Sequence, residues 1–269
     1  MCDLIAVFEE HVFLFFDRHN TSLENYADGD DFLVAWKRWK RTAIDKQVKT
    51  VAGAERYLRN SNNDLFLDAK RAQPFPIDIP REKAIIHKII VASGAEEACL
   101  KYSEDNISGS LALTYSDDND INSETPFHVK LNNEEIIHVF DTKNLEIVFS
   151  ELDTISDLLA YFVAKEEIIN KTDCLAYCAE EDLLAQYYLN FDEAEQRHYI
   201  LPRNQEYNGI MIPEGDWVEF IKSDAYKRKK QADKISYFWD ELIQVTSSNA
   251  FSGTLCGDTD KINLTSAIK

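Results

Sequence analysis

Glycine is scarce in this chain, with eight glycines among 269 residues. Loops that cradle phosphate groups rely on closely spaced glycines, and the sequence contains neither a GxxxxGKS motif nor a GxGxxG motif after a strand. The HExxH and GxSxG motifs are absent as well. The usual motifs for nucleotide hydrolysis, dinucleotide oxidoreduction, zinc proteolysis and serine hydrolysis are therefore missing.

Basic residues are also few relative to acidic ones. The chain has 29 Lys and Arg against 48 Asp and Glu, which gives a formal net charge of -19. Such a charge repels phosphate backbones and argues against broad, nonspecific binding of DNA or RNA. Any activity on nucleic acid would need a local basic patch, a metal ion or a basic partner.

The cysteines do not form a disulfide framework, because the chain has five of them at irregular spacing. A reducing cytoplasm fits this usage best. Cys174 and Cys178 lie four residues apart, so two thiols would share one face of a helix. Buried or idle thiols are the favoured interpretation of this pair, with a zinc site as the alternative.

Long apolar runs are missing too. No stretch reaches the roughly 18 uninterrupted apolar residues that a membrane-spanning helix requires. The first residues are apolar but are interrupted by Glu9, Glu10 and His11 and lack a basic leader, so we expect no signal peptide. A soluble, cytoplasmic protein without a membrane partner is expected.

The apolar pattern predicts an α+β fold, a mixed sheet of about four to six strands flanked by long helices. We expect helices at residues 3–18, 32–60, 95–102, 141–169, 179–189 and 215–245. We expect strands at residues 64–69, 84–94, 108–116, 126–131 and 135–141. The expected parts are an N-terminal helix and linker (1–30), an α+β core (31–200) and a C-terminal helical extension with a tail (201–269).

The helix expected at residues 32–60 is basic although the protein is acidic. It carries eight Lys or Arg against Asp45 and Glu55, a local sum of +6. A solvated helix face is the favoured interpretation, and docking of phosphate groups or of an acidic partner is the alternative. The candidate nucleic-acid-binding residues are Lys37, Arg38, Lys40 and Arg41.

Two triplets of the form Asp-x-Lys follow apolar runs, at Asp68-Ala69-Lys70 and at Asp141-Thr142-Lys143. Metal-dependent cleavage of phosphodiesters uses converging carboxylates to hold Mg²⁺ and a Lys near the attacking water. Residues i and i+2 of a strand share a face, so a shared site for Asp68 and Lys70 is one interpretation of the first triplet. The other is a solvated strand end before a Pro-rich loop. Asp141 starts the helix expected at 141–169, which favours a capping role for it.

The order of these elements resembles the core of the restriction-endonuclease-like (PD-(D/E)XK) superfamily, which includes nuclease-related domains of bacterial defence proteins. The resemblance covers residues 32–169: a helix with Glu55, a strand ending in Asp68-x-Lys70, a buried strand, two more strands and a helix. It implies a nuclease-like hydrolase in which Asp68, Lys70 and Glu55 are catalytic. Asp68 and Glu55 would then hold Mg²⁺ or Mn²⁺.

Two other functions stay open. The chain is alternatively a non-catalytic acidic subunit or regulator, whose negative charge steers it to a basic protein partner. A third option is a small-molecule enzyme that uses His138 and nearby carboxylates. His87 lies inside the apolar run at 84–94, where a hydrogen-bonded core histidine is the favoured interpretation.

Overall fold

The computed structural model describes residues 2–23, 32–60, 64–103, 108–117, 125–202 and 207–252. The chain divides into two compact units, Met1–Trp217 and Val218–Lys269. Cys256 and the predicted tail beyond residue 252 lie outside the described residues. The three-part division at residues 30 and 200 stays a prediction.

The first unit contains two four-stranded mixed sheets together with helices, which confirms the predicted α+β fold class. In the first sheet β2, β3 and β6 run parallel and β1 is antiparallel to β2. Its order is β1 (Leu4–Phe8), β2 (His11–His19), β3 (Ile85–Ser93) and β6 (His138–Phe140). The order of the second sheet is β10 (Gly209–Ile212), β7 (Cys174–Tyr177), β4 (Ala112–Ser116) and β5 (His128–Leu131). A further two-stranded pair consists of β8 (Phe191–Asp192) and β9 (Arg197–His198).

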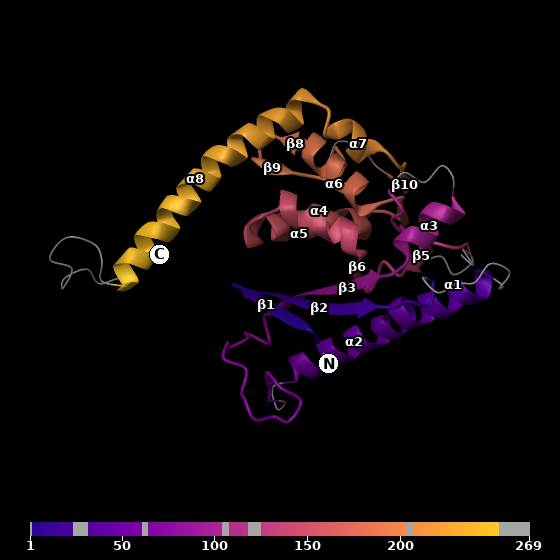
Figure 1. Ribbon diagram of the computed structural model, residues 1–269, viewed down its shortest axis with the longest axis horizontal. Helices are drawn as coiled ribbons and strands as arrows, with labels where there is room; N and C mark the ends of the chain where they lie inside the picture. The colour runs from indigo at the N-terminus through magenta and orange to yellow at the C-terminus, as the bar shows by residue number, and fades with distance from the viewer. Residues whose placement is uncertain are drawn as a thin grey trace. The chain divides into compact units, whose positions relative to one another are not determined.

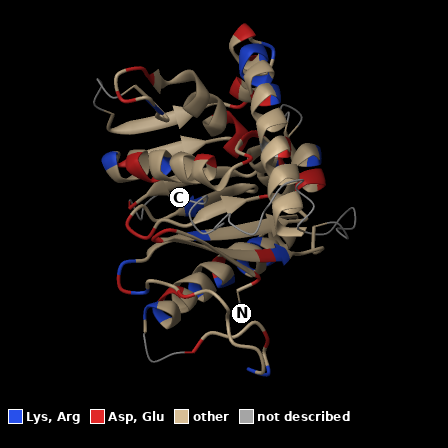
Figure 2. Cartoon of the chain, turned by 90° about the vertical axis from the view of Figure 1, so that its left-hand side faces the viewer, with Lys and Arg blue, Asp and Glu red and all other residues tan. Residues whose placement is uncertain are grey.

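Helices cover both faces of the first sheet (Figure 1). The described helices are α1 (Phe32–Lys40), the π-helical η1 (Arg41–Asp45), α2 (Lys46–Arg59), α3 (Glu96–Tyr102), α4 (Thr142–Glu151), α5 (Ile155–Lys171), α6 (Glu180–Leu189), α7 (Asp216–Phe220) and α8 (Asp224–Ser252). Neighbouring residues of β3 identify the two faces: Lys88 pairs with a carboxylate of α2, and His87 with one of α5. Charged side chains lie mostly on helices and loops, and the strands are largely uncharged (Figure 2).

The basic helix predicted at 32–60 is confirmed as the continuous segment α1–η1–α2. Trp36 and Trp39 are buried, and their rings stack with centroids 5.4 Å apart. The Trp39 indole N–H donates to the Ser93 carbonyl at the end of β3 over 3.3 Å. This apolar side fixes the segment against the first sheet and leaves its basic side in solvent. None of the described helices has the length and hydropathy needed to cross a membrane.

The helix predicted at residues 3–18 is wrong, because this segment forms the hairpin of β1 and β2. The five residues from Val12 to Phe16 are all buried, since β2 has a neighbouring strand on each side and helices over both faces. Such a strand is apolar at consecutive positions. A short apolar run also fits the pattern of a helix with a wide apolar face, which is why a helix was predicted here. Glu9, at a positive φ of 53°, makes the turn.

Three further expectations need correction. Residues 64–69 are not a strand, since they contain only an isolated bridge between Phe66 and Pro74. The helix predicted at 141–169 is two helices, α4 and α5, and the second starts at the capping residue Thr154. The helix predicted at 215–245 is also interrupted, and the Ser223 hydroxyl caps the start of α8.

Candidate functional site: a buried histidine–carboxylate cluster

The predicted catalytic residue Asp68 lies in an exposed turn. Its carboxylate accepts hydrogen bonds from the backbone N–H groups of Lys70, Ala72 and Gln73, at 2.7, 3.0 and 2.8 Å. The hydrogen bond from Gln73 contributes most to holding the pKa of Asp68 below its ordinary value, and the other two act in the same direction. The carboxylate therefore stabilises the turn, which is the usual structural role of Asp in a loop.

Glu55, the second predicted metal ligand, is engaged elsewhere. It pairs with Arg59 at 2.9 Å and with Lys88 at 3.0 Å. Burial favours a higher pKa for Glu55, but the two cations outweigh it and the pKa lies below its ordinary value. Among the described residues, no hydrogen bond or ion pair joins Glu55 to Asp68. The structure does not bring the predicted catalytic groups into direct contact.

The candidate nucleic-acid-binding residues lie on the outer side of α1 and η1. Lys37, Arg38 and Arg41 are exposed, and Lys40 is partly exposed and pairs with Asp45 at 3.2 Å. This side faces away from the first sheet, because the tryptophans of the same helix face towards it. The basic residues are thus separated by the sheet from every group on the α5 side.

Asp141 is a helix cap, as predicted. Its carboxylate accepts from the Asn144 backbone N–H at 2.8 Å, and the Asn144 side-chain oxygen accepts from the Asp141 N–H at 3.0 Å. This reciprocal pair starts α4. The second Asp-x-Lys triplet is therefore a helix start.

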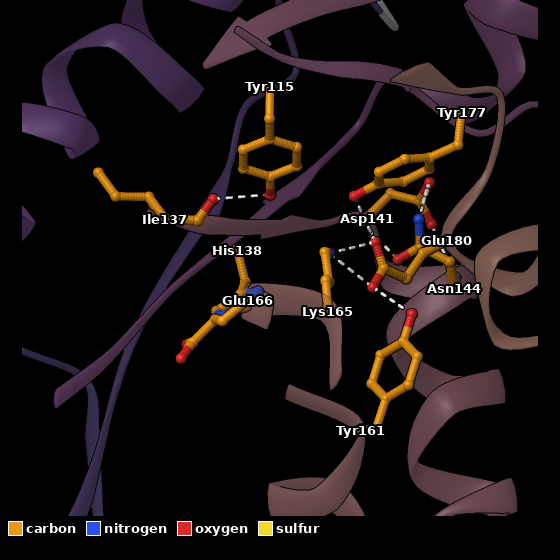
Figure 3. A network of polar contacts seen from close by, with 10 residues as sticks. All are labelled: Tyr115, Ile137, His138, Asp141, Asn144, Tyr161, Lys165, Glu166, Tyr177 and Glu180. Atoms are coloured by element: carbon orange, nitrogen blue, oxygen red, sulfur yellow. Dashed lines mark hydrogen bonds and ion pairs between the residues drawn. The ribbon is translucent and has the colours of Figure 1, made fainter. Parts of the chain in front are cut away.

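One buried polar network surrounds the Lys165 ammonium group of α5 (Figure 3). Both carboxylate oxygens of Glu180 lie 2.7 Å from the ammonium group. The hydroxyl groups of Tyr161 and Tyr177 donate to the same carboxylate, at 2.7 and 2.8 Å. The side chains of the ion pair are 0% exposed. A fully satisfied and closed network of this kind indicates a structural role.

A second polar cluster surrounds Glu166, the residue of α5 that follows Lys165. The register of the first sheet builds it: Ile89 of β3 lies opposite His138 of β6, so His87, two residues earlier, shares a face with His138. Glu166 of α5 covers this face. Its Oε1 atom lies 2.8 Å from His87 Nδ1 and 2.9 Å from His138 Nε2. We call His87, His138 and Glu166 the histidine–carboxylate cluster.

The rings of the two histidines are held by aromatic neighbours. Phe162, one turn before Glu166 on α5, stacks on His138 with centroids 4.3 Å apart and planes 9° apart. Phe13 of β2 stacks on His87 at 4.8 Å. Since a stacked, buried ring has little freedom, the nitrogen atoms that face Glu166 are fixed by packing.

The cluster is buried but not closed. The side chains of both histidines are 0% exposed, and the side chain of Glu166 is 24% exposed. Burial raises the pKa of Glu166, but the hydrogen bonds from His138 and His87 outweigh it and hold the pKa far below its ordinary value. Burial lowers the pKa of His138. Glu166 is thus an ionised carboxylate that reaches solvent between two buried imidazoles.

Two observations set this cluster apart from the Lys165 network. The Nδ1 atom of His138 is buried and has no hydrogen-bond partner, which is uncommon for a buried polar atom in a native protein. In addition, the three ligand atoms of the cluster all lie within 4.8 Å of one another. Across the residues that the structure describes, this is the one group of three or more His, Cys, Asp or Glu side chains with metal-ligand spacing.

The donor set fits a divalent transition-metal ion. Two imidazoles and one carboxylate are the ligands of many Zn²⁺ and Fe²⁺ sites, whereas Mg²⁺ prefers oxygen ligands throughout. Bonds of about 2.1 Å to a tetrahedral ion place its ligands roughly 3.4 Å apart, so the Glu166 oxygen must withdraw by about half an ångström. Rotation of the partly exposed Glu166 side chain provides that movement.

Sequence reasoning found part of this cluster. His87 is a hydrogen-bonded core residue, as predicted. His138 lies on the neighbouring strand, a pairing that was not predicted. The connection with Glu166 was missed, because helical spacing shows which residues face the core but not which strand each one meets. The available signal was a histidine inside each of two apolar strands.

The cluster is the strongest site among the described residues on geometric grounds. Comparison with models of protein families, with curated proteins and with solved structures finds no match for this chain.

Proposed function

We propose that this protein binds a divalent transition-metal ion through His87, His138 and Glu166 and uses it to activate water for hydrolysis. The observation that supports the proposal is the convergence of three ligand atoms, two of them on fully buried rings, around one partly exposed carboxylate. Three protein ligands leave a coordination position open for water, the arrangement of catalytic zinc sites.

The surroundings of the cluster favour entry of a cation. Glu9 and Glu10 form the turn before His11, and both interact electrostatically with His11, which contacts His87. Acidic groups near a site attract metal ions. The ion would lower the pKa of its bound water towards neutrality and so supply hydroxide.

Nucleic acid is the substrate class that we propose, on the basis of the sequence resemblance to the restriction-endonuclease-like superfamily. The exposed basic residues of α1 and η1 are the proposed phosphate-binding groups, and they lie on the opposite face of the first sheet from the cluster. A substrate bound there would have to pass around the sheet edge to reach the ion. The Mg²⁺ site at Asp68 and Glu55 stays a separate prediction.

The first test is cleavage of labelled single- and double-stranded DNA and RNA by full-length protein freed of metal and then reloaded with Zn²⁺, Mn²⁺ or Mg²⁺. We expect Zn²⁺ or Mn²⁺ to restore hydrolysis. Glu166→Gln should lower the rate by about 100-fold or more, because the ion loses its anionic ligand. The matched control is Glu167→Gln, because Glu167 follows Glu166 in the sequence but its carboxylate pairs with Arg197.

Asp68→Ala separates this proposal from the prediction made on the Asp-x-Lys triplet. If the cluster is the metal centre, Asp68→Ala keeps its hydrolytic rate as long as the fold is intact by circular dichroism. Loss of hydrolysis in Asp68→Ala together with normal rates in Glu166→Gln would transfer the catalytic role to the triplet. Equal rates in all the variants would overturn both assignments.

A non-catalytic acidic subunit is the second candidate, and the net charge of -19 supports it. Such a protein would bind a basic partner through long-range attraction that weakens with salt. Its four described cysteines, Cys2, Cys99, Cys174 and Cys178, form no disulfide with one another. We propose a cytoplasmic location for either function.

A further inference from the structure

We infer that His11 is a positioning residue of the metal centre, which fixes the ring nitrogen that His87 presents to the ion. The inference rests on the proposed function and adds to it a residue outside the three ligands. His11 is the first residue of β2 and is partly exposed.

The geometry connects His11 to the cluster through a single hydrogen bond. Phe13 lies opposite His87 in the β2–β3 register, so His11 occupies the preceding position on the same face. His11 Nδ1 lies 2.9 Å from His87 Nε2, and the two rings are 15° from parallel. His87 therefore has a partner at each nitrogen, Glu166 at Nδ1 and His11 at Nε2.

Proton placement makes this contact directional. A neutral imidazole carries one N–H, and the nitrogen that binds a metal ion must offer its lone pair. When Nδ1 of His87 binds the ion, its proton is on Nε2, and that N–H donates to Nδ1 of His11. His11 then carries its own proton on Nε2. Outer-shell acceptors of this kind fix both the tautomer and the orientation of a metal-binding histidine.

Loss of His11 would be costly because His87 has no exposed surface. The side chain of His87 is 0% exposed, so an Nε2–H without His11 would be a buried donor that water cannot reach. His138 offers a contrast, since its Nδ1 has no hydrogen-bond partner. The support for the ion's imidazole ligands thus comes through His87, and we expect the affinity for the ion to depend on His11.

The experiment compares two substitutions that differ in hydrogen bonding. His11→Gln supplies a carbonyl oxygen that accepts from His87 Nε2–H, whereas His11→Leu accepts nothing. His19→Leu is the control, because His19 is an exposed histidine at the other end of the same strand and bonds Ser93. Zn²⁺ affinity is measured by chelator competition on the full chain, and the visible spectrum of the Co²⁺-loaded protein reports ligand geometry.

We expect His11→Leu to weaken Zn²⁺ binding by about 10- to 100-fold and to alter the Co²⁺ spectrum. His11→Gln should recover most of the affinity and the wild-type spectrum, and His19→Leu should match the wild type. Wild-type affinity and spectrum in His11→Leu would overturn the inference while leaving the metal centre in place. Failure of His11→Gln to improve on His11→Leu, with both variants folded, would overturn it as well.

The two proposals fail in distinguishable ways. If the wild-type protein binds neither Zn²⁺ nor Co²⁺, the proposed function fails, and the role of His11 in it fails too. If the wild type binds Zn²⁺ and the His11 variants bind it equally well, the role of His11 alone is contradicted.

Discussion

Lys165→Met should destabilise the first unit by about 3–5 kcal/mol, the cost of removing one partner from a buried ion pair. The substitution leaves the Glu180 carboxylate 0% exposed with two tyrosine hydroxyls as its remaining described partners. Burial lowers the pKa of Lys165, because removal from water disfavours the charged form of the ammonium group. Urea denaturation followed by circular dichroism measures the change.

The double variant Lys165→Met/Glu180→Gln distinguishes charge from packing. The amide oxygen that replaces the carboxylate still accepts hydrogen bonds from the tyrosines, and no buried charge remains. We therefore expect the double variant to be more stable than Lys165→Met by at least about 1 kcal/mol. Lys171→Met is the control, since its side chain on the same helix is 59% exposed and should change stability by less than about 0.5 kcal/mol. If Lys165→Met behaves like this control, the buried ion pair does not stabilise the first unit.

Glu181→Gln should stabilise the protein at alkaline pH and have little effect at acidic pH. Glu181 lies in the first turn of α6, is buried and has one carboxylate oxygen without a hydrogen-bond partner. Burial, followed by the charges of Asp141 and Asp182, raises its pKa to about 7, from an ordinary value of 4.5. Ionising such a group in the folded state is unfavourable.

The sign of the effect follows from linkage. A carboxyl group whose pKa is raised by folding contributes stability below its unfolded pKa, and this contribution is lost as the pH rises through the folded pKa. For Glu181 the window runs from 4.5 to about 7. The free energy of unfolding of Glu181→Gln should therefore rise relative to wild type by about 2–3 kcal/mol between pH 4 and pH 8.

Urea denaturation at both pH values tests this expectation, with the exposed Glu193→Gln as the control. Glu166 has the opposite sign, since its depressed pKa contributes stability that is lost only as the solution becomes strongly acidic. Glu166 is present in both proteins, so its contribution to the pH dependence of stability cancels in the comparison. If the difference in the free energy of unfolding between Glu181→Gln and wild type does not change with pH, burial does not raise the pKa of Glu181.

Much of the fold was predictable from hydrophobic spacing. The strand at Ile85–Ser93 and the basic helix over Phe32–Arg59 were predicted because their patterns are long and flanked by clear turn signals. The β1–β2 hairpin was not, because an internal strand with both faces covered loses the alternation that identifies strands. The break between α4 and α5 was missed because apolar spacing continues across it.

The candidate site was less predictable than the fold. Asp68 had the right residue type after an apolar run, but the backbone there forms a turn that occupies its carboxylate. The cluster instead depends on the pairing of β3 with β6, which places Ile89 opposite His138 although the two are far apart in the sequence. Glu166 then reaches it from a third element. No local sequence pattern encodes such a convergence. Only His87 and His138 can be identified from the sequence, because each lies within an apolar strand.

The most direct test of the central claim is the metal content of the purified full-length protein after equilibration with Zn²⁺ and removal of the free ion. Our account predicts about one bound ion per chain, and loss of that ion in the His87→Gln/His138→Gln double variant. The control His128→Gln, at a histidine that bonds Thr114 in the second sheet, should retain it. A wild-type chain without bound ion, or a double variant that keeps it, would contradict the account.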